Sequence, residues 1–367
     1  MITYVFSNGR QSRVQNKSVE AKEFFYGYFD FINQGNKVQL IEFNNRKKVK
    51  KSFLYYLDKV FNKLFSLPFN SHLITTRENL KILRSSEKII LVNEKVGFSC
   101  LYLIMLIRLT STKNQIVLFS MGLYSKKLNF NYFSIIHNFF IKLLIYFLDD
   151  IIFLGFPEFK KATELNKKNK SKFHFVPFSI DQSFWINSGE INKDYLLFIG
   201  NDGNRDYELL KKIISQLSDL NFLVVTNNEL FNNFTNPNLE KIRGSWGNNF
   251  ISDNEIRSLY QNALLTILPL KNSYQPSGQS VALQSMSMGT PVIISNTEGF
   301  WDIKNFENNK NIKFVYKPLV EKWKTSIDDL LNNKDTYIKI ASNGIDTVSS
   351  LYSSEIFFSK LKAILKL

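Results

Sequence analysis

The run of residues 275–294 constrains this chain more than any other stretch. It contains the small-residue loop Ser277-Gly278-Gln279-Ser280, a short helical pattern, the corner Gly289-Thr290-Pro291 and the apolar strand pattern that begins at Val292. A Ser/Gly loop that feeds a helix start offers unpaired backbone N–H groups, and the helix dipole favours negative charge there. The run therefore predicts a phosphate-binding loop and helix, although an ordinary capped helix would also fit these residues alone.

Short apolar runs alternate with helical patterns along the whole chain, which predicts parallel sheets covered by helices, an α/β fold. Strands are expected at 2–6, 38–43, 88–92, 115–119, 151–154, 195–199, 221–226, 264–268, 291–294 and 312–316. Helices are expected around 18–34, 52–65, 97–109, 132–148, 205–218, 253–262, 279–288 and 320–332. A chain of 367 residues is long enough for two domains. Their boundary is expected between Val176 and Lys193, where Pro177 ends a strand and Ser188-Gly189 loosens the chain.

The loop, helix and Gly-Thr-Pro-Val corner, followed by Gly299 and Asp302, resemble the donor-sugar signature of the family 4 (group 1) glycosyltransferases. Other stretches agree with that family in order: Pro177 to Trp185, Leu196 to Gly200 with Arg205-Asp206, and Ser252 to Ile256 with Tyr260 and Ala263. The resemblance covers roughly residues 175–345, while the first half of the chain matches only in its general pattern.

The resemblance implies the GT-B fold, in which two Rossmann-like domains face each other across a cleft. Residues 1–176 would form the acceptor-side domain and residues 190–349 the donor domain. A last helix, at about 350–367, would cross back to the N-terminal domain. The donor would be a UDP- or GDP-sugar, the acceptor a glycan or a lipid-linked molecule, and the pathway cell-surface polysaccharide or glycoconjugate synthesis. The resemblance implies no cofactor beyond the donor substrate.

One departure from the family pattern concerns catalysis. Retaining members carry two Glu residues eight positions apart, and the corresponding residues here are Pro276 and Gln284, neither of which is acidic. Gln284 can still hydrogen-bond a sugar hydroxyl. The Ser-Gly-Gln-Ser motif therefore indicates a variant enzyme, and a non-catalytic GT-B protein that binds a nucleotide sugar is the alternative.

The donor phosphates are expected beside Gly200, Asn201 and Arg205, because ligands of parallel sheets bind beyond the carboxyl ends of the strands. Arg205 could neutralise a diphosphate as a forked donor, whereas a plain turn followed by a helix-capping Asp206 is the alternative. Cations and backbone dipoles can stabilise the leaving diphosphate without a metal. No Asp-x-Asp pair follows a strand, and the three His residues lack metal-ligand spacing, so no metal site is expected.

Further donor contacts are expected after two other strands. The base is expected near Arg243 to Trp246, where Trp246 could stack on it or simply pack in the core. By resemblance, Glu298 and Asp302 lie near the donor sugar, although Asp302 could equally cap the following helix.

The acceptor side is expected around Gly9, after the first strand, and around Glu94, after the third. If the reaction inverts the anomeric centre, a carboxylate must accept the proton of the acceptor hydroxyl. Glu94 is the candidate catalytic base, and its alternative role is a favourable charge at a helix N-terminus.

Positive charge is concentrated in the first half of the chain. The net charge is +15, yet residues 1–180 alone hold 28 Lys and Arg against 12 Asp and Glu, together with 23 of the 34 Phe residues. This asymmetry indicates an anionic partner surface. No nucleic-acid module is recognisable. The basic run Arg46 to Lys51 leads into Phe53, Leu57, Val60, Phe61 and Leu64, which predicts either a helix on anionic lipid or a helix facing the core.

The remaining features concern location. The chain opens with a strand pattern instead of a signal peptide, and no apolar run reaches the ~20 residues of a membrane-spanning helix. The single cysteine, Cys100, excludes an intrachain disulfide and is expected to be buried and inert. We expect a cytoplasmic protein, peripheral on the inner face of the cell membrane.

Overall fold

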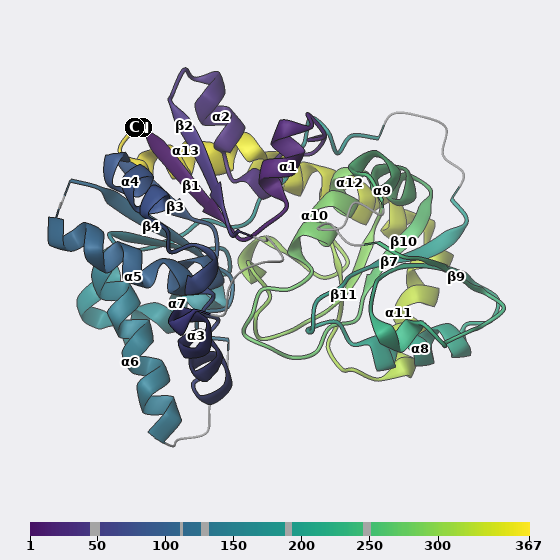
Figure 1. Ribbon diagram of the computed structural model, residues 1–367. Helices are drawn as coiled ribbons and strands as arrows, with labels where there is room; N and C mark the ends of the chain where they lie inside the picture. The colour runs from purple at the N-terminus through teal and green to yellow at the C-terminus, as the bar shows by residue number, and fades with distance from the viewer. Residues whose placement is uncertain (45–51, 111–112, 126–131, 188–192, 245–250) are drawn as a thin grey trace. The chain divides into compact units, whose positions relative to one another are not determined.

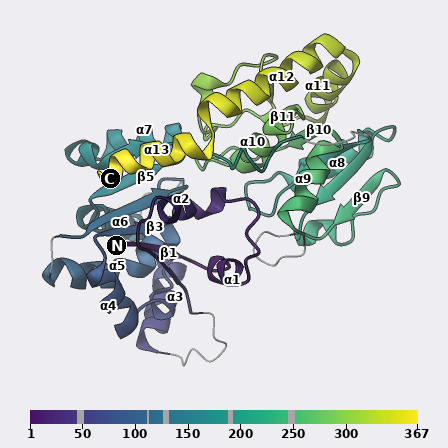
Figure 2. The same ribbon diagram turned by 90° about the horizontal axis from the view of Figure 1, so that it is seen from above.

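The computed structural model describes residues 1–44, 52–110, 113–125, 132–187, 193–244 and 251–367 (Figures 1 and 2). The chain forms two compact units. The first consists of Met1–Val19, Phe25–Val176 and Phe358–Leu367, and the second of Glu20–Phe24 and Pro177–Phe357. The basic run 46–51, the expected linker residues Ser188-Gly189 and Trp246 lie outside the described residues.

The first unit is built on a parallel sheet of six strands in the order β2-β1-β3-β4-β5-β6. The strands are β1 (Ile2–Phe6), β2 (Val38–Glu42), β3 (Lys88–Leu91), β4 (Gln115–Ser120), β5 (Asp150–Phe153) and β6 (Phe173–Phe175). Most residues of β1, β3, β4 and β5 are buried, as their continuous apolar sequences require in a sheet covered on both faces. The expected strands of this half are confirmed. β6 is the strand that Pro177 was expected to end, but its bounds were not predicted, because three residues carry too little periodicity to define them.

Helices surround this sheet. They are α1 (Arg10–Gln15), α2 (Tyr28–Asn33), α3 (Phe53–Leu64), α4 (Arg77–Ser85), α5 (Glu94–Thr110), α6 (Tyr132–Phe147) and α7 (Phe156–Leu165), with short 3-10 turns at Ser71–Leu73 and Lys167–Lys172. The single helix expected at 18–34 is wrong. A 3-10 turn at Glu23–Phe25 and α2 stand there, separated by Gly27, which adopts a φ of 82°. That left-handed backbone suits glycine and interrupts a helix.

The last helix, α13 (Ser354–Leu365), packs on the first unit through its later turns, as expected. The rings of Phe31 and Phe358 lie 4.7 Å apart, and the side-chain amide of Gln115 donates to the carbonyl of Ile364 at 2.9 Å. A Cβ on Gly27 would lie 3.1 Å from Phe358, so this glycine also allows the close approach of α13.

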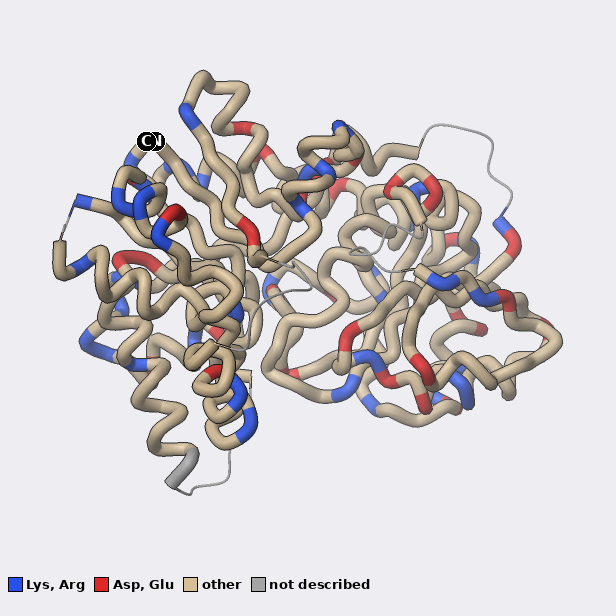
Figure 3. The backbone as a smooth tube through the Cα atoms, in the orientation of Figure 1, with Lys and Arg blue, Asp and Glu red and all other residues tan. Residues whose placement is uncertain are grey.

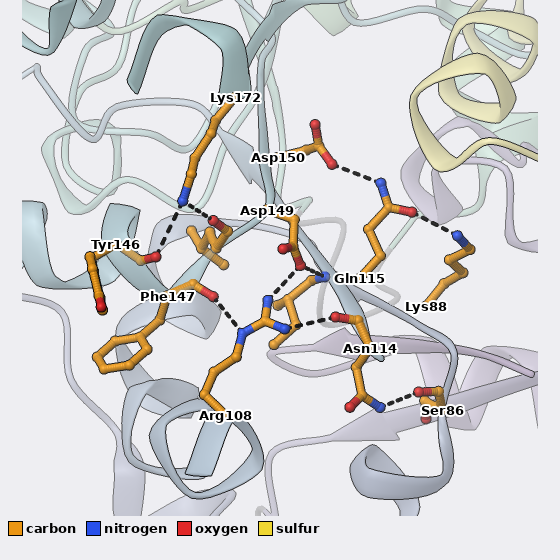
Figure 4. Close-up of polar contacts among 12 residues, drawn as sticks. Ser86, Lys88, Arg108, Asn114, Gln115, Tyr146, Phe147, Asp149, Asp150 and Lys172 are labelled. Atoms are coloured by element: carbon orange, nitrogen blue, oxygen red, sulfur yellow. Dashed lines mark hydrogen bonds and ion pairs between the residues drawn. The ribbon is translucent and has the colours of Figure 1, made fainter. Parts of the chain in front are cut away.

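A polar network secures the amino ends of β4 and β5 (Figure 4). Arg108 donates to the carbonyls of Phe147 at 3.1 Å and Asn114 at 2.8 Å, and it pairs with Asp149. Lys172 donates to the carbonyl of Leu148 at 2.6 Å. These cations satisfy carbonyls at the end of α6, where the helix dipole is negative. The network is structural and lies at the amino ends of the strands, opposite to their carboxyl ends.

The second unit repeats the scheme with the strand order β12-β11-β10-β7-β8-β9. The strands are β7 (Tyr195–Ile199), β8 (Asn221–Val225), β9 (Leu239–Ile242), β10 (Ala263–Leu268), β11 (Val292–Ser295) and β12 (Lys313–Val315). The helices are α8 (Tyr207–Gln216), α9 (Asp253–Gln261), α10 (Gln279–Ser287), α11 (Val320–Asn332) and α12 (Lys334–Leu351), with 3-10 turns at Glu229–Phe231 and Ile303–Asn305. Two six-stranded parallel units confirm the α/β class and the Rossmann-like character of both halves.

The extent of the units has one feature that was not expected. Glu20–Phe24 belongs to the second unit although the residues on either side belong to the first, and the main part of the second unit runs from Pro177 to Phe357. The helix α12 was not expected, because its Asn343-Gly344 pair is a turn signal in the sequence. In the structure, Gly344 packs against Met286. A Cβ added at Gly344 would lie 3.5 Å from the Cβ of Met286. Tertiary packing therefore overrides the local signal.

Candidate functional site

Arg205 is the most unusual side chain of the second unit. It follows the loop after β7 and is only 3% exposed, yet its Nε has no hydrogen-bond partner among the described residues. Its Nη1 forms an ion pair with Asp202 at 3.2 Å. A Cβ on Gly200 would lie 2.3 Å from Arg205 Nε, so the guanidinium occupies space that only a glycine leaves open. A buried guanidinium that still has an unpaired N–H donor is suited to bind an anion.

The N-terminus of α10 lies against this guanidinium. Gly278 caps the helix with a φ of 77°, and no side chain accepts from the first turn. A Cβ on Gly278 would lie 3.5 Å from Arg205 Nη1. The next residue, Gln279, is buried, and its Oε1 also has no hydrogen-bond partner among the described residues. The expected loop and the expected cation therefore meet, and together they form a positively polarised corner.

Asn204 connects the two loops that build this corner. Its Nδ2 donates to Gln275 Oε1 at 3.0 Å and to Ser277 Oγ at 2.9 Å, while its carbonyl accepts from the Lys271 backbone at 2.8 Å. The backbone of Asp206 then donates to the carbonyl of Pro269 at 2.9 Å. The side-chain amide of Asn204 and two backbone hydrogen bonds thus fix both loops relative to each other.

A cavity of about 140 Å³ lies at the carboxyl ends of β7, β8 and β9. It is lined by Phe24, Trp185, Ile199, Asn201, Val225, Gly244, Ile251, Asp253, Ile256, Tyr260, Ser280, Val281 and Gln284. Asn201 ties the strand ends together, because its Nδ2 donates to the Gly244 carbonyl at 2.7 Å and its Oδ1 accepts from the Asn227 backbone. Because Ser280, Val281 and Gln284 belong to α10, the cavity and the polarised corner share that helix.

Gln284 lies in a buried hydrogen-bond network that no sequence motif predicts. Its Nε2 donates to Glu23 Oε1 at 2.8 Å, and its Oε1 accepts from the Tyr260 hydroxyl at 3.0 Å. Trp185 Nε1 donates to the same Glu23 oxygen at 2.8 Å. Burial raises the pKa of Glu23 to about 7, against the lowering effect of these donors.

Three other predicted donor residues lie elsewhere in the second unit. Glu298 lines a separate hollow of about 580 Å³ at the carboxyl ends of β10 to β12, together with Lys271. Asp302 is buried and accepts from the Tyr352 hydroxyl at 2.8 Å and from Asn305 Nδ2 at 2.7 Å. Arg243 is exposed and donates to Asn232 at 3.3 Å. The neighbouring Gly244, and not Arg243, lines the cavity at the carboxyl ends of β7 to β9.

The predicted acceptor-side residues both follow strands of the first unit. Gly9 caps the short helix α1 with a φ of 80°, and the next backbone N–H donates to Glu42. Glu94 begins α5 and accepts from the Met121 backbone and from Ser120 Oγ, the latter at 3.1 Å.

A second carboxyl group faces Glu94 across Ser120. Glu158 is fully buried; its Oε1 lies 3.2 Å from Ser120 Oγ, and it accepts from the Tyr124 backbone at 2.9 Å. Burial and the nearby Glu94 raise the pKa of Glu158 to about 8, and burial also raises the pKa of Glu94. At neutral pH this pair therefore retains a proton. Glu158 lies in no sequence motif, so the sequence alone could not predict its place beside Glu94.

Residues 191–347 match the family model described as "Glycosyl transferases group 1". This range includes Arg205, α10 and the cavity-lining residues from Ile199 to Gln284, but not Phe24 and Trp185. No curated protein sequence matches the chain.

Solved structures show the same fold over the whole chain. A sucrose-phosphate synthase from Thermosynechococcus elongatus is 14% identical, with a TM-score of 0.70 over 100% of this chain and 98% of its own. The HepE protein of Anabaena, in complex with UDP and glucose, is 11% identical, with a TM-score of 0.66 over 100% and 99%. A glycosyltransferase from Rickettsia africae ESF-5 is 14% identical, with a TM-score of 0.66 over 100% and 98%. These similarities confirm the GT-B type of fold.

Two absences hold for the described residues. No three His, Cys, Asp or Glu side chains gather there as metal ligands would. None of the helices described combines the length and the apolar character needed to span a bilayer.

Proposed function

We propose that this protein is a glycosyltransferase that takes a sugar from a UDP- or GDP-sugar bound in the second unit. The observation that carries this proposal is the buried Arg205, unpaired at Nε and lying against the uncapped helix start at Gly278. A diphosphate would supply the acceptors that this corner lacks. The family match over residues 191–347, and the UDP that HepE holds, support the same assignment.

The nucleoside belongs, in this proposal, in the cavity at the ends of β7 to β9. Ser280 and Gln284 line that cavity and stand on the helix that starts at Gly278, so a nucleoside there would lead directly to a diphosphate at the helix start. Carboxyl ends of parallel strands are the usual ligand edge of such sheets. The donor is the only small molecule that the proposed reaction needs.

The chemistry that follows is stabilisation of a leaving group. As the glycosidic bond breaks, negative charge develops on the nucleoside diphosphate. The Arg205 guanidinium and the backbone N–H groups of the first turn of α10 would bind that charge in place, which lowers the barrier. We therefore propose that the donor site works without a metal ion.

The acceptor would be a glycan or a lipid-linked molecule bound by the first unit, in cell-surface polysaccharide or glycoconjugate synthesis. Glu94 is the proposed base if the transfer inverts the anomeric centre. Burial raises its pKa, which makes it a stronger base than an exposed Glu, as general-base catalysis requires.

An anionic membrane surface is the proposed partner of the first unit, which would hold the protein at the inner face of the cell membrane. Three of its helices each carry a stripe of exposed large apolar side chains. These are Phe53, Tyr56, Val60 and Leu64 on α3, Tyr102, Met105 and Leu109 on α5, and Ile135, Phe139 and Tyr146 on α6. Phe53, Val60 and Leu64 point outward, whereas Leu57 and Phe61 are half-buried. Exposed apolar stripes beside an excess of positive charge suit anionic lipid.

Thermal unfolding in the presence of nucleotides tests the proposed function. A ligand that binds only the folded protein raises the melting temperature by mass action. We expect UDP- or GDP-sugars, and the matching nucleoside diphosphate, to raise the Tm, and AMP and free sugars to leave it unchanged. A panel of UDP-, GDP-, ADP- and CMP-sugars without any shift would reject the proposal.

A non-catalytic nucleotide-sugar-binding protein is the second candidate, because neither Pro276 nor Gln284 is acidic. Both candidates predict donor binding, so binding alone does not separate them. The two candidates are separated by the release of free nucleoside diphosphate from the donor that raises the Tm. Slow release without an acceptor supports the enzyme, and release no faster than in a buffer blank, with or without acceptor glycans, supports the binding protein.

A further inference from the structure

The segment Glu20–Phe24 is attached to the second unit although it lies between α1 and α2 in sequence. Its backbone is fixed by carboxylates of that unit. Ala21 N donates to Asp253 Oδ2 at 3.3 Å, and Lys22 N donates to Asp181 Oδ2 at 3.3 Å. The Glu20 carboxylate accepts from the Asn254 backbone at 2.9 Å, at the start of α9. Several anchors within five residues indicate a defined part of the unit and not a loose connection.

One residue of this segment lines the cavity at the carboxyl ends of β7 to β9, and a second supports its wall. Phe24 forms part of its wall and contacts the ring of Phe178, with the centroids 5.5 Å apart. Glu23 stands behind the wall, with its carboxyl group buried, and binds two lining residues, Trp185 and Gln284, through Oε1 at 2.8 Å each.

Glu23 thereby fixes the orientation of the Gln284 amide. A carboxylate oxygen accepts hydrogen bonds, so it must face the NH₂ group of the amide, while Tyr260 donates to the amide oxygen. Without Glu23 the two ends of the amide could exchange places at little cost. With it, a ligand in the cavity meets one defined arrangement of donor and acceptor.

We infer that Glu20–Phe24 completes the nucleoside pocket of the donor site, with Glu23 as a positioning residue for Gln284 and Phe24 as a wall. This inference rests on the proposed function. It also explains why residue 284 is a neutral Gln. A carboxylate at that position would stand within hydrogen-bond distance of Glu23, and two like charges in one buried site repel each other.

Affinities for UDP and GDP, measured by calorimetry together with the Tm, test the inference on the full chain. The variants are Glu23→Gln, Gln284→Glu, the exchange Glu23→Gln/Gln284→Glu, and Glu321→Gln as a control at an exposed carboxylate of α11. We expect Glu23→Gln to weaken binding of the preferred nucleotide about tenfold, the size of one lost hydrogen bond to a charged group. The control should bind like the wild type.

The exchange variant distinguishes pairing from simple damage. Gln284→Glu should lower the Tm more at pH 8.5 than at pH 6, because the two carboxyl groups share a proton only at the lower pH. The exchange restores one carboxylate and one amide, so it should recover the Tm and most of the affinity. Wild-type affinity in folded Glu23→Gln and Gln284→Glu would overturn the inference while leaving the proposed function intact. Absence of nucleotide binding in the wild type would instead reject the proposed function.

Discussion

The pair Glu94 and Glu158 shows what burial does to a single residue. Ser120 Oγ lies between the two carboxyl groups, and the loop after β4 donates backbone N–H groups to both. The proton that one carboxyl group retains offsets the cost of a second buried charge beside the first.

This pair makes stability depend on pH. The folded protein holds the proton up to a pH of about 8, whereas an unfolded Glu releases it near pH 4.5, so the folded state binds more protons in between. Stability must then fall as the pH rises through this window. We expect Glu158→Gln to flatten the fall of the Tm between pH 6 and pH 9. Glu164→Gln, at an exposed site on the same helix, should keep the wild-type slope, and equal slopes in all three proteins would refute the shared proton.

Sequence reasoning proposed some residues of the candidate site and missed others for physical reasons. Arg205 and Gly278 were predictable because each belongs to a motif with a mechanism: a loop after a strand and a small-residue helix start. Glu23 and Glu158 were not, because a glutamate in no motif carries no sign of burial. Only the folded chain shows that Glu23 faces Gln284 from 261 positions away.

At the scale of elements, the candidate site is built by two loops that contact each other. The loop after β7 and the loop before α10 come together through Asn204, whose amide donates to Gln275 and Ser277. Asn204→Ala should therefore cost about 1 kcal/mol of stability and also weaken nucleotide binding.

Asn238→Ala provides the matched comparison. Its Nδ2 donates to the carbonyls of Leu217 and Leu220 at 2.8 Å each, at the end of α8 and away from the cavity lining. We expect both variants to lower the Tm, but only Asn204→Ala to raise the Kd of the nucleotide in calorimetry. If both variants bind equally well, the loop contact serves stability alone.

Elements were predictable where periodicity is strong and local. The apolar runs of β1 and β10 predicted these strands correctly, because a buried parallel strand is apolar on both faces. The prediction of one helix at 18–34 is wrong for two reasons. Part of this stretch belongs to the second unit, and Gly27 adopts a left-handed backbone that interrupts a helix. The family resemblance, and not periodicity, predicted that α13 would pack on the first unit.

At the scale of the whole molecule, charge and exposed apolar surface belong to the same unit. Residues 1–180 carry a net +16, and Figure 3 shows Lys and Arg along the helices of that unit. The apolar stripes of α3, α5 and α6 lie on the same helical elements.

Sedimentation with vesicles tests this surface. We expect binding to vesicles of mixed phosphatidylcholine and phosphatidylserine, weak binding to phosphatidylcholine alone, and loss of binding at high salt. Phe53→Asn/Val60→Asn should reduce binding, whereas Leu230→Asn, at an exposed apolar residue of the second unit, should not. Stronger binding to duplex DNA at the same salt would favour a nucleic-acid partner instead.

The most direct test of the central claim is the Kd of the preferred nucleoside diphosphate for Arg205→Met, measured by calorimetry beside Lys322→Met at an exposed cation of α11. A lost charge-assisted pair should weaken binding at least tenfold, and Gly200→Ala should do the same because its Cβ takes the space of the guanidinium. Lys322→Met should bind like the wild type. Unchanged affinity in a folded Arg205→Met would contradict the diphosphate site and, with it, the account of donor binding.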